Sequence, residues 1–450
     1  MYLGQKGLTI PKSTISESEQ ARIKKDLTVI PKSLYQPLPP FYIYRESGNK
    51  LYVPRFYMKN EGTNQVQEGA NIQVAFTGSI RTAQQFAIDA YLSAKCGLLQ
   101  LPCGFGKTIV ALYLISRIQK KTLVIVHKEF LMDQWIERIQ EFLPTAKIGK
   151  IQGTTIDITG KDIVLGMLQS LSTKIYEREV FQDFGFTIID ETHHMGAEVF
   201  SNALFQIVTP YMLGLSATME RKDGLTKIFK LFLGEVVYSA QREKMDNITV
   251  QMIKYTTPDI EFNETIMNFK GQANYSSMIK KICEFNSRTE FILTVLTTLL
   301  TDKNNSQIMI LAHNKSVLTY LYDAIQHRKI ASVGYYVGGM KQADLKLTES
   351  KQVVIATYAM AEEALDIKTL TTLIMATPKT DVTQAVGRIL REVHVNPTIV
   401  DIVDSHDTFK RQWDKRKKYY LSQNYAIVHS SNKTYPVFTP LQSKPSKCNI

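Results

Sequence analysis

The stretch LQLPCGFGKTIVALYLI, residues 99–115, decides the fold class of this chain. Strand-like apolar residues run up to Leu101, and apolar residues recur at helical spacing after Lys107. Between them, Gly104 and Gly106 let backbone N–H groups converge on one point without Cβ clashes. The helix start adds partial positive charge, and Thr108 adds a hydroxyl. This order predicts a phosphate-binding loop, with the candidate residues Pro102, Cys103, Gly104, Phe105, Gly106, Lys107 and Thr108.

The loop departs from the usual phosphate-loop pattern at one position. That pattern begins with Gly five positions before Gly106, where this chain has Leu101. A Gly-Lys-Thr tripeptide by itself also fits a helix cap. A phosphate loop therefore requires support from elsewhere in the chain.

That support comes from FTIIDETHHM, residues 186–195, where an apolar strand ends in Asp190 and Glu191. Acids at the carboxyl end of a parallel strand lie where α/β sheets bind ligands. Asp190 is predicted to hold magnesium together with Thr108, and Glu191 to polarise the attacking water. A metal site on the two adjacent histidines is disfavoured, because neighbouring side chains point in different directions.

Alternating strand and helix patterns on both sides of a polar stretch predict two successive α/β units with parallel sheets. The expected order is an accessory module with strands at 1–75, a first α/β domain at 76–240, a connector at 241–285, a second α/β domain at 286–405 and a basic tail at 406–450. The first module is distinguished by its Tyr and Pro content and by alternating aromatic runs.

The composition is that of a globular chain, with 44% hydrophobic and 21% charged residues among 450. No apolar run approaches the roughly 20 residues needed to cross a bilayer, so no membrane is expected among the partners. The four cysteines are scattered without metal-ligand spacing, and the amino terminus lacks the apolar core of a secretory signal. These features predict a reducing, intracellular setting.

A net charge of +12 favours polyanionic partners. Residues 405–450 hold nine Lys and Arg against two Asp. Within FKRQWDKRKKYY, residues 409–420, the positive charges alternate with Phe409, Trp413, Tyr419 and Tyr420. Phosphate neutralisation and stacking on bases would use this mixture. A solvated basic tail is the equally simple alternative.

DVTQAVGRILR, residues 381–391, places Gln384, Arg388 and Arg391 on one helix face, because they are four and three residues apart. Apolar residues such as Val386 are expected to bury the other side. Two arginines in this arrangement suit the stabilisation of charge in phosphoryl transfer. The alternative is a solvated basic helix end.

Seven segments in chain order resemble motifs of the superfamily 2 helicases of the DEXH-box type. They are PCGFGKT, VHKEFLMDQW, LGMLQSL, DETH, SAT, ATYAMAEEALDI and QAVGRILR, similar to motifs I, Ia, Ic, II, III, V and VI. The likeness covers about residues 78–405. GLSATMERKDG further resembles the XPB-like branch, and within it the DNA-dependent ATPases of large DNA viruses, including the poxvirus-type transcript-release helicases.

The resemblance implies two tandem RecA-like domains, with ATP and Mg²⁺ between them and a nucleic acid strand across their tops. It implies catalytic roles for Lys107, Glu191, Arg388 and Arg391. It also implies nucleotide contacts from Arg81 and Gln84 in SIRTAQQ, which would meet adenine, and from Asp190, Asp366 and Gln384.

Two residues depart from the family pattern. Glu362 and Ala364 stand where relatives have a small hydroxyl residue and glycine. A carboxylate at the first position would repel a nearby phosphate, and a side chain at the second restricts the backbone. These changes bear on how strand contact is coupled to hydrolysis.

The expected function is that of an ATP-dependent motor on double-stranded DNA, in viral transcription termination and transcript release or in DNA repair and recombination. The alternatives are an RNA helicase and a hydrolysis-deficient subunit that clamps DNA. The expected partners are nucleic acid and transcription or repair machinery, bound by a monomer. The expected location is the host cytoplasm or virion, with the nucleus left open.

Overall fold

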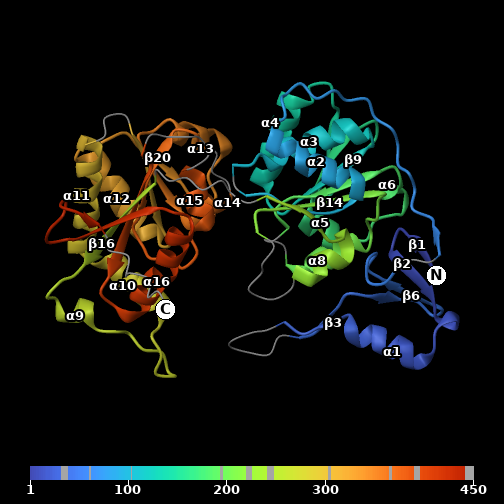
Figure 1. The fold of residues 1–450 in the computed structure, drawn as a ribbon, viewed down its shortest axis with the longest axis horizontal. Coiled ribbons are helices and arrows are strands. Elements are labelled where there is room, and N and C mark those ends of the chain that lie inside the picture. The colour runs from blue at the N-terminus through green and yellow to red at the C-terminus, as the bar shows by residue number, and fades with distance from the viewer. Residues whose placement is uncertain are drawn as a thin grey trace, which may run out of the picture. The chain divides into compact units, whose positions relative to one another are not determined.

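The computed structural model describes residues 1–31, 39–59, 62–102, 104–192, 196–218, 226–240, 248–302, 306–363, 367–389 and 396–440, with positions 342, 362–363 and 388–389 described as backbone only (Figure 1). The chain divides into two compact units, Met1–Arg242 and Glu243–Ile450. No helix in these ranges is both long and apolar enough to span a bilayer.

The first unit begins with a small sheet of five short strands in the order β5-β6-β2-β1-β7. Its strands are β1 (Tyr2–Gly4), β2 (Gly7–Pro11), β5 (Arg45–Glu46), β6 (Lys50–Val53) and β7 (Thr63–Asn64). The 3₁₀ helix η1 (Lys12–Thr14), helix α1 (Glu17–Asp26) and the pair β3 (Thr28–Val29) and β4 (Phe41–Tyr42) accompany it. Ser16 caps α1 by accepting a hydrogen bond from the Glu19 N–H. The predicted small module with strands is confirmed.

An eight-stranded sheet forms the centre of the first unit, in the order β11-β10-β12-β9-β13-β14-β8-β15. The strands are β8 (Cys96–Gln100), β9 (Thr122–Val126), β10 (Ile148–Gln152), β11 (Thr155–Asp157), β12 (Ile163–Met167), β13 (Phe186–Ile189), β14 (Tyr211–Ser216) and β15 (Val236–Ser239). All pairs are parallel except β10 with β11. Strands β9, β12 and β13 are buried at every residue, because helices cover both faces of a parallel sheet.

Two apolar clusters lie on the two faces of this sheet. Leu98 and Leu99 are adjacent on β8, and they belong to different clusters because side chains alternate along a strand. One face is covered by α2 (Thr82–Ala94), α3 (Lys107–Ile118) and α4 (Glu129–Phe142). The other is covered by α5 (Leu168–Thr173), α6 (Glu179–Gln182), α7 (Ala197–Leu204), α8 (Thr226–Leu233) and the small amino-terminal sheet.

The second unit has its own eight-stranded sheet, in the order β18-β19-β17-β20-β21-β16-β22-β23. The strands are β16 (Thr249–Tyr255), β17 (Gln307–Ala312), β18 (Val333–Tyr336), β19 (Val353–Thr357), β20 (Leu370–Met375), β21 (Thr398–Asp404), β22 (Ala426–Ser431) and β23 (Thr439–Pro440). Only β22 with β23 is antiparallel. Two mostly parallel sheets covered by helices form tandem RecA-like α/β domains.

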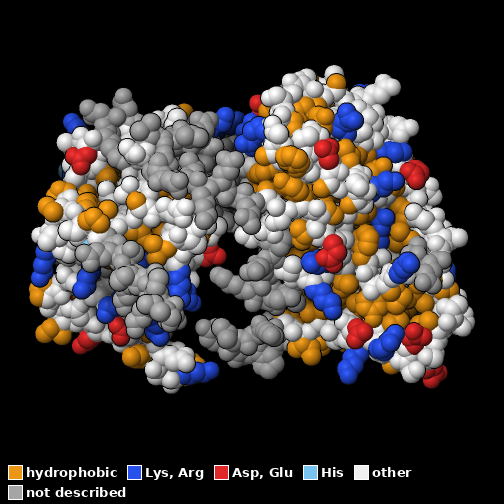
Figure 2. All heavy atoms as spheres, viewed as in Figure 1, with side chains coloured by type: hydrophobic (Ala, Val, Ile, Leu, Met, Phe, Trp, Pro, Cys, Tyr) orange, Lys and Arg blue, Asp and Glu red, His pale blue; other side chains and the backbone are white. Residues whose placement is uncertain are grey.

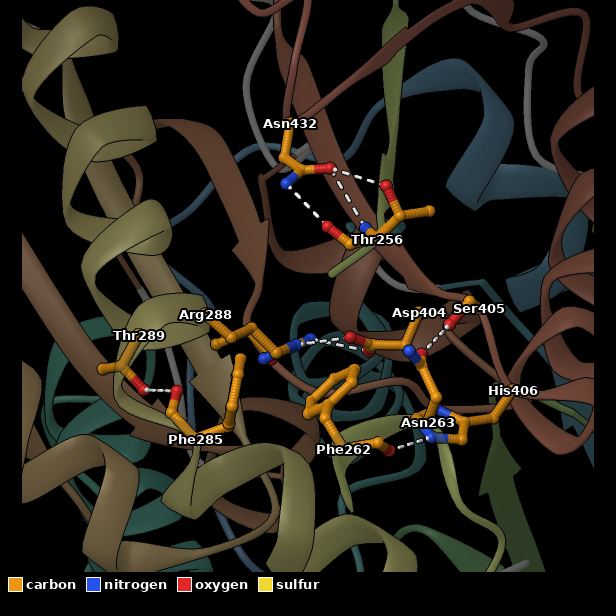
Figure 3. Close-up of polar contacts among 11 residues, drawn as sticks. Thr256, Phe262, Asn263, Phe285, Arg288, Thr289, Asp404, Ser405, His406 and Asn432 are labelled. Carbon is orange, nitrogen blue, oxygen red and sulfur yellow. Dashed lines mark hydrogen bonds and ion pairs between the residues drawn. The ribbon is translucent and has the colours of Figure 1, made fainter. Parts of the chain in front are cut away.

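Eight helices are described in the second unit. They are α9 (Ile260–Asn263), α10 (Tyr275–Glu284), α11 (Asn286–Asp302), α12 (Lys315–His327), α13 (Gln342–Glu349), α14 (Tyr358–Glu363), α15 (Thr383–Ile389) and α16 (Asp407–Ser422). A buried ion pair joins α11 to the end of β21, with Arg288 Nε 2.6 Å from Asp404 Oδ1 and Nη2 2.8 Å from Oδ2 (Figure 3).

The structure differs from the expected organisation at two places in this unit. Strand β16 lies within the stretch expected to be a connector, and it pairs with both β21 and β22 inside the sheet. Its polar Gln251 and Lys254 concealed the strand pattern. The segment expected to be a basic tail likewise belongs to the domain: it supplies β22 and β23 to the same sheet and the helix α16 that packs on it.

The aromatic residues of the basic segment are mostly inside the protein. Phe409, Trp413 and Tyr420 are buried on α16, and only Tyr419 among the four is partly exposed. Base stacking by those three rings, one of the two interpretations of the sequence, is therefore wrong. Lys and Arg side chains are spread over both units on the face drawn in Figure 2.

Candidate nucleotide site

The predicted phosphate loop joins β8 to α3 in the first unit. Its entry is fixed by a hydrogen bond from the Leu101 N–H to the Ser216 carbonyl at the end of β14, 2.8 Å long. Gly104 and Gly106 have φ angles of +81° and +88°, a region that favours glycine. A Cβ on Gly106 would also lie 2.5 Å from Gln84 Nε2. The structure thus requires glycine where α3 begins. Cys103 lies outside the described residues.

The start of α2 holds this loop in shape. Gln84 is buried; its Oε1 accepts a hydrogen bond from the Arg81 N–H at 2.9 Å, and its Nε2 donates to the Phe105 carbonyl at 2.8 Å. Arg81 Nη2 donates to the carbonyls of Phe105 and Gly104. Both ends of the Gln84 amide are therefore engaged, one by the start of α2 and the other by the loop itself. The adenine contact implied for Arg81 and Gln84 stays a prediction.

Asp190 follows the carboxyl end of β13 and is only 6% exposed. Its Oδ2 accepts a hydrogen bond from Trp135 Nε1 on α4 at 2.8 Å, and its Oδ1 accepts one from the Glu191 N–H at 2.9 Å. Burial, with a smaller contribution from the charge of Glu191, raises the pKa of the Asp190 carboxyl to about 6. A buried carboxylate of this kind is stabilised by an arriving cation.

Trp135 is a site residue that the sequence alone did not reveal. It lies in the segment similar to motif Ia, where it occupies one apolar position of an amphipathic helix. A buried indole N–H needs a hydrogen-bond acceptor, so a tryptophan on a buried helix face indicates that such a partner exists. Nothing in the sequence shows that this acceptor is Asp190, 55 positions later.

Glu191 brings the acidic loop to the phosphate loop. Its Oε1 lies 2.6 Å from Lys107 Nζ, and the two side chains are 20% and 13% exposed. Glu191 has a φ angle of +50°, which a non-glycine residue adopts only at a cost of roughly 1–3 kcal/mol. The fold keeps this conformation, and with it the contact between the two predicted catalytic side chains.

The acidic loop is also tied to the SAT segment. The hydroxyl of Thr192 donates to the Leu215 carbonyl at 3.4 Å, and Ser216 Oγ donates to the Thr218 carbonyl at 2.5 Å. The ends of β8, β13 and β14 therefore come together at the carboxyl edge of the first sheet. That edge is where ligands bind in α/β sheets.

The candidate residues of the second unit are only partly described. Gln384 is partly buried on α15, and Ala385 and Val386 are buried as the pattern predicts. Arg388 lies on α15, but its side chain is outside the description, as are Asp366 and Arg391 altogether.

The residues present fit a nucleotide with Mg²⁺. In the described ranges, no cluster of three or more His, Cys, Asp or Glu could hold a metal by itself. Mg²⁺ in nucleotide sites is instead held by one or two side chains together with phosphates. Thr108 in the first turn of α3 and the buried Asp190 are the donors at this edge, with the Lys107 ammonium and the helix start for the phosphates.

Comparisons with known proteins agree with this geometry. Residues 77–221 match the family described as "Type III restriction enzyme, res subunit". The chain is 35% identical to "Putative ATP-dependent RNA helicase L396" of Acanthamoeba polyphaga mimivirus, over 94% of this chain and 85% of the relative.

Two further relatives cover less of the chain. One is "Putative ATP-dependent RNA helicase QP509L" of African swine fever virus, 26% identical over 74% of this chain and 69% of the relative. The other is "DNA 3'-5' translocase XPB2" of Sulfurisphaera tokodaii, 35% identical over 37% of each chain.

Proposed function

Because the chain belongs to the superfamily 2 helicases and is an ATP-hydrolysing enzyme, we propose that it uses ATP to move along double-stranded DNA. The observation that carries the ATP-dependent part is the 2.6 Å contact of Lys107 with Glu191 beside the glycine loop. It joins a cation for phosphate to a carboxylate that can act on water.

In the proposed cycle, the backbone N–H groups of the loop and Lys107 would bind the phosphates, and Thr108 and Asp190 would hold Mg²⁺. Bound ATP supplies the phosphoanhydride whose cleavage drives the motor. Lys107 exchanges its Glu191 partner for phosphate oxygens, which leaves Glu191 to accept a proton from water. Arg388 and Arg391 of the second unit stabilise the charge that develops on phosphoryl transfer.

The choice of DNA rests on two supports. GLSATMERKDG resembles the XPB-like branch, and the relative from Sulfurisphaera is named as a DNA translocase. An RNA substrate is the second candidate, because the mimivirus and African swine fever virus relatives are named as RNA helicases. We place the activity in transcript release or DNA repair in a viral setting, in the host cytoplasm or virion.

The test is the steady-state ATPase rate of the full chain with no nucleic acid, single-stranded DNA, duplex DNA or RNA. Stimulation by duplex DNA above the other additions is the expected result. Stimulation by RNA alone would replace the DNA assignment by the RNA candidate. Equal rates in all four conditions would contradict a nucleic-acid-driven motor.

A further inference from the structure

A narrow hairpin over residues 266–274 connects α9 to α10 in the second unit. The Asn274 N–H donates to the Ile266 carbonyl and the Asn268 N–H to the Gln272 carbonyl, each at 2.7 Å. Asn268 Oδ1 accepts from the N–H groups of Lys270 and Gln272 at 2.9 and 3.0 Å, which closes the turn. The backbone of this small element is therefore well defined by its own hydrogen bonds.

The tip of the hairpin presents an aromatic ring to solvent. Phe269 is 94% exposed, and Lys270 Nζ lies 5.5 Å from the centre of its ring. A ring exposed in this way is free to stack on a flat aromatic partner, and the ammonium beside it adds a positive charge. In Figure 1 the hairpin extends beyond α9 and α10, away from the sheet.

Both roots of the hairpin are fixed to the carboxyl edge of the second sheet. On α9, the Phe262 carbonyl lies 2.7 Å from His406 Nε2, and Ser405 Oγ donates to Asn263 Oδ1 at 3.3 Å, just after β21 (Figure 3). On α10, Tyr275 Oη donates to the Pro378 carbonyl after β20 at 3.1 Å. The hairpin therefore projects from the carboxyl edge of the second sheet. Helix α15, which carries Arg388, follows β20 at the same edge.

The charges along the hairpin suit a polyanion. Lys270 is the one charged residue of the hairpin, whereas Lys280 and Lys281 lie on α10, where Lys280 Nζ is 3.8 Å from Glu284 Oε1. The nearby acids Glu261 and Glu264 precede the hairpin at its root. Lys281 Nζ donates to the backbone carbonyls of both, which brings a cation to that root. The tip itself carries only Phe269, Lys270 and neutral polar residues.

We propose that this hairpin is a nucleic acid contact in which Phe269 stacks on an unpaired base and Lys270 meets a neighbouring phosphate. Every base offers a π-face, so a single exposed ring next to a cation needs no sequence specificity. Met267 and Ile266, 58% and 36% exposed, lie on the same hairpin, and the Lys270 ammonium beside the Phe269 ring favours a polyanionic partner over an apolar protein surface. The inference rests on the proposed function and adds to it a specific contact for single strands.

The test compares full-length variants by equilibrium anisotropy with labelled oligothymidylate and oligouridylate of about 20 nucleotides and a duplex of the same length, without ATP. Phe269→Ala should weaken binding of one or both single strands about 5- to 100-fold, the range that base stacking spans. Phe269→Tyr, which keeps the ring, should bind within about twofold of the unaltered chain. Ile260→Ala is the matched control, since Ile260 is a 79% exposed apolar residue of the same unit.

The duplex arm separates this inference from the proposed function. Duplex affinity should be unchanged by Phe269→Ala, because paired bases do not offer their faces. Single-strand binding equal to that of the unaltered chain, or an equal loss on strands and duplex, would overturn the hairpin contact while leaving the motor intact. Binding of duplex but of neither single strand by the unaltered chain would likewise overturn the hairpin contact and leave the motor intact. An unaltered chain that binds no nucleic acid at all would overturn both the hairpin contact and the proposed function.

Discussion

The contact between Lys107 Nζ and Glu191 Oε1 makes Glu191 the residue whose charge is most directly tested by substitution. Glu191→Gln keeps the shape of the side chain and removes its negative charge and its basicity. We expect ATP to bind and turnover to fall by about 100-fold or more, the size of a general-base contribution. Equilibrium nucleotide titration and steady-state hydrolysis measure the two effects.

Glu179 on α6 is exposed and serves as the control for that substitution. Glu179→Gln should leave both measurements unchanged. Turnover of Glu191→Gln close to that of the unaltered chain would contradict the assignment of the DETH segment as the catalytic acid pair.

Gly106 combines a φ angle of +88° with a crowded position against Gln84 Nε2. Gly106→Ala should therefore distort the loop, with nucleotide affinity falling about tenfold or more. Gly153→Ala isolates the backbone effect, because Gly153 has a φ angle of +57° and a Cβ added there would meet nothing within 4 Å. It should cost about 1 kcal/mol of stability and leave nucleotide binding unchanged. Equal nucleotide affinity in the two variants would show that the crowding at Gly106 is unimportant.

At the scale of elements, the loop that leads into α15 is held by side chains from four helices. The carbonyls of residues 376–379 accept, in order, from Arg288, Tyr358, Tyr275 and Arg416 at 2.8, 2.6, 3.1 and 2.6 Å. These donors come from α11, α14, α10 and α16. The loop before α15, the helix that carries Arg388, is therefore positioned by the helices that pack on the sheet.

Arg416, like Arg288, also binds both oxygens of a buried carboxylate, in its case Asp401 at 2.7 and 2.8 Å. Arg416→Met should lower the free energy of unfolding by about 3–5 kcal/mol, because it leaves Asp401 buried without its cation. The double variant Arg416→Met/Asp401→Leu should recover part of this loss. Denaturant unfolding measures both.

Lys410 is an exposed residue of the same helix and gives the matched control. Lys410→Ala should leave the unfolding midpoint unchanged, since exposed ion pairs contribute little. If Arg416→Met unfolds at the same denaturant concentration as Lys410→Ala, the buried pair does not hold α16 to the sheet.

The parts of the site that could be predicted from sequence are the contiguous ones. The glycine loop and the acids after β13 each carry a strand, a turn and a chemical group within about ten residues. Partners distant in sequence gave no such signal, as with Trp135 and Asp190 or Arg288 and Asp404. The order of most strands along the chain and the burial of their residues followed from hydrophobic pattern alone.

Helix α16 shows how a stronger signal concealed a weaker one. Phe409, Trp413, Arg416 and Tyr420 are spaced four, three and four apart, which is the stripe of a buried helix face. The dense positive charge of the same segment suggested an exposed nucleic acid contact instead. Charge and periodicity belong to opposite faces of one helix, and only the exposed face is open to a ligand.

At the scale of the whole molecule, the positive charges of α16 that can contact DNA are those on its exposed face. They are Lys410, Arg411, Lys415 and Lys418. Replacing these four by Gln leaves the buried face intact, whereas a deletion would remove β22 from the sheet. The slope of log affinity against log salt should become shallower by about 0.9 for each duplex phosphate that is no longer neutralised. An unchanged slope would show that this face is solvated.

Removing Lys107 from the first unit and Arg388 from the second should have different effects on ATP binding and turnover. Lys107 is proposed to contact phosphates in the ground state and the transition state alike, so Lys107→Ala should weaken ATP binding as well as turnover. Arg388 is proposed to act chiefly in the transition state. Arg388→Ala should therefore lower turnover roughly a thousandfold, with ATP affinity changed much less.

Measuring ATP affinity by equilibrium titration beside turnover on saturating duplex DNA separates the two losses. Arg411→Ala provides a control for charge, because Arg411 is an exposed arginine of the same unit on α16. Its removal should leave hydrolysis unchanged once DNA is saturating. Normal hydrolysis by Arg388→Ala would mean that the first unit hydrolyses ATP without the second. Coupled motion of two RecA-like domains would then no longer account for the motor, because nothing in the second unit would respond to the phosphate.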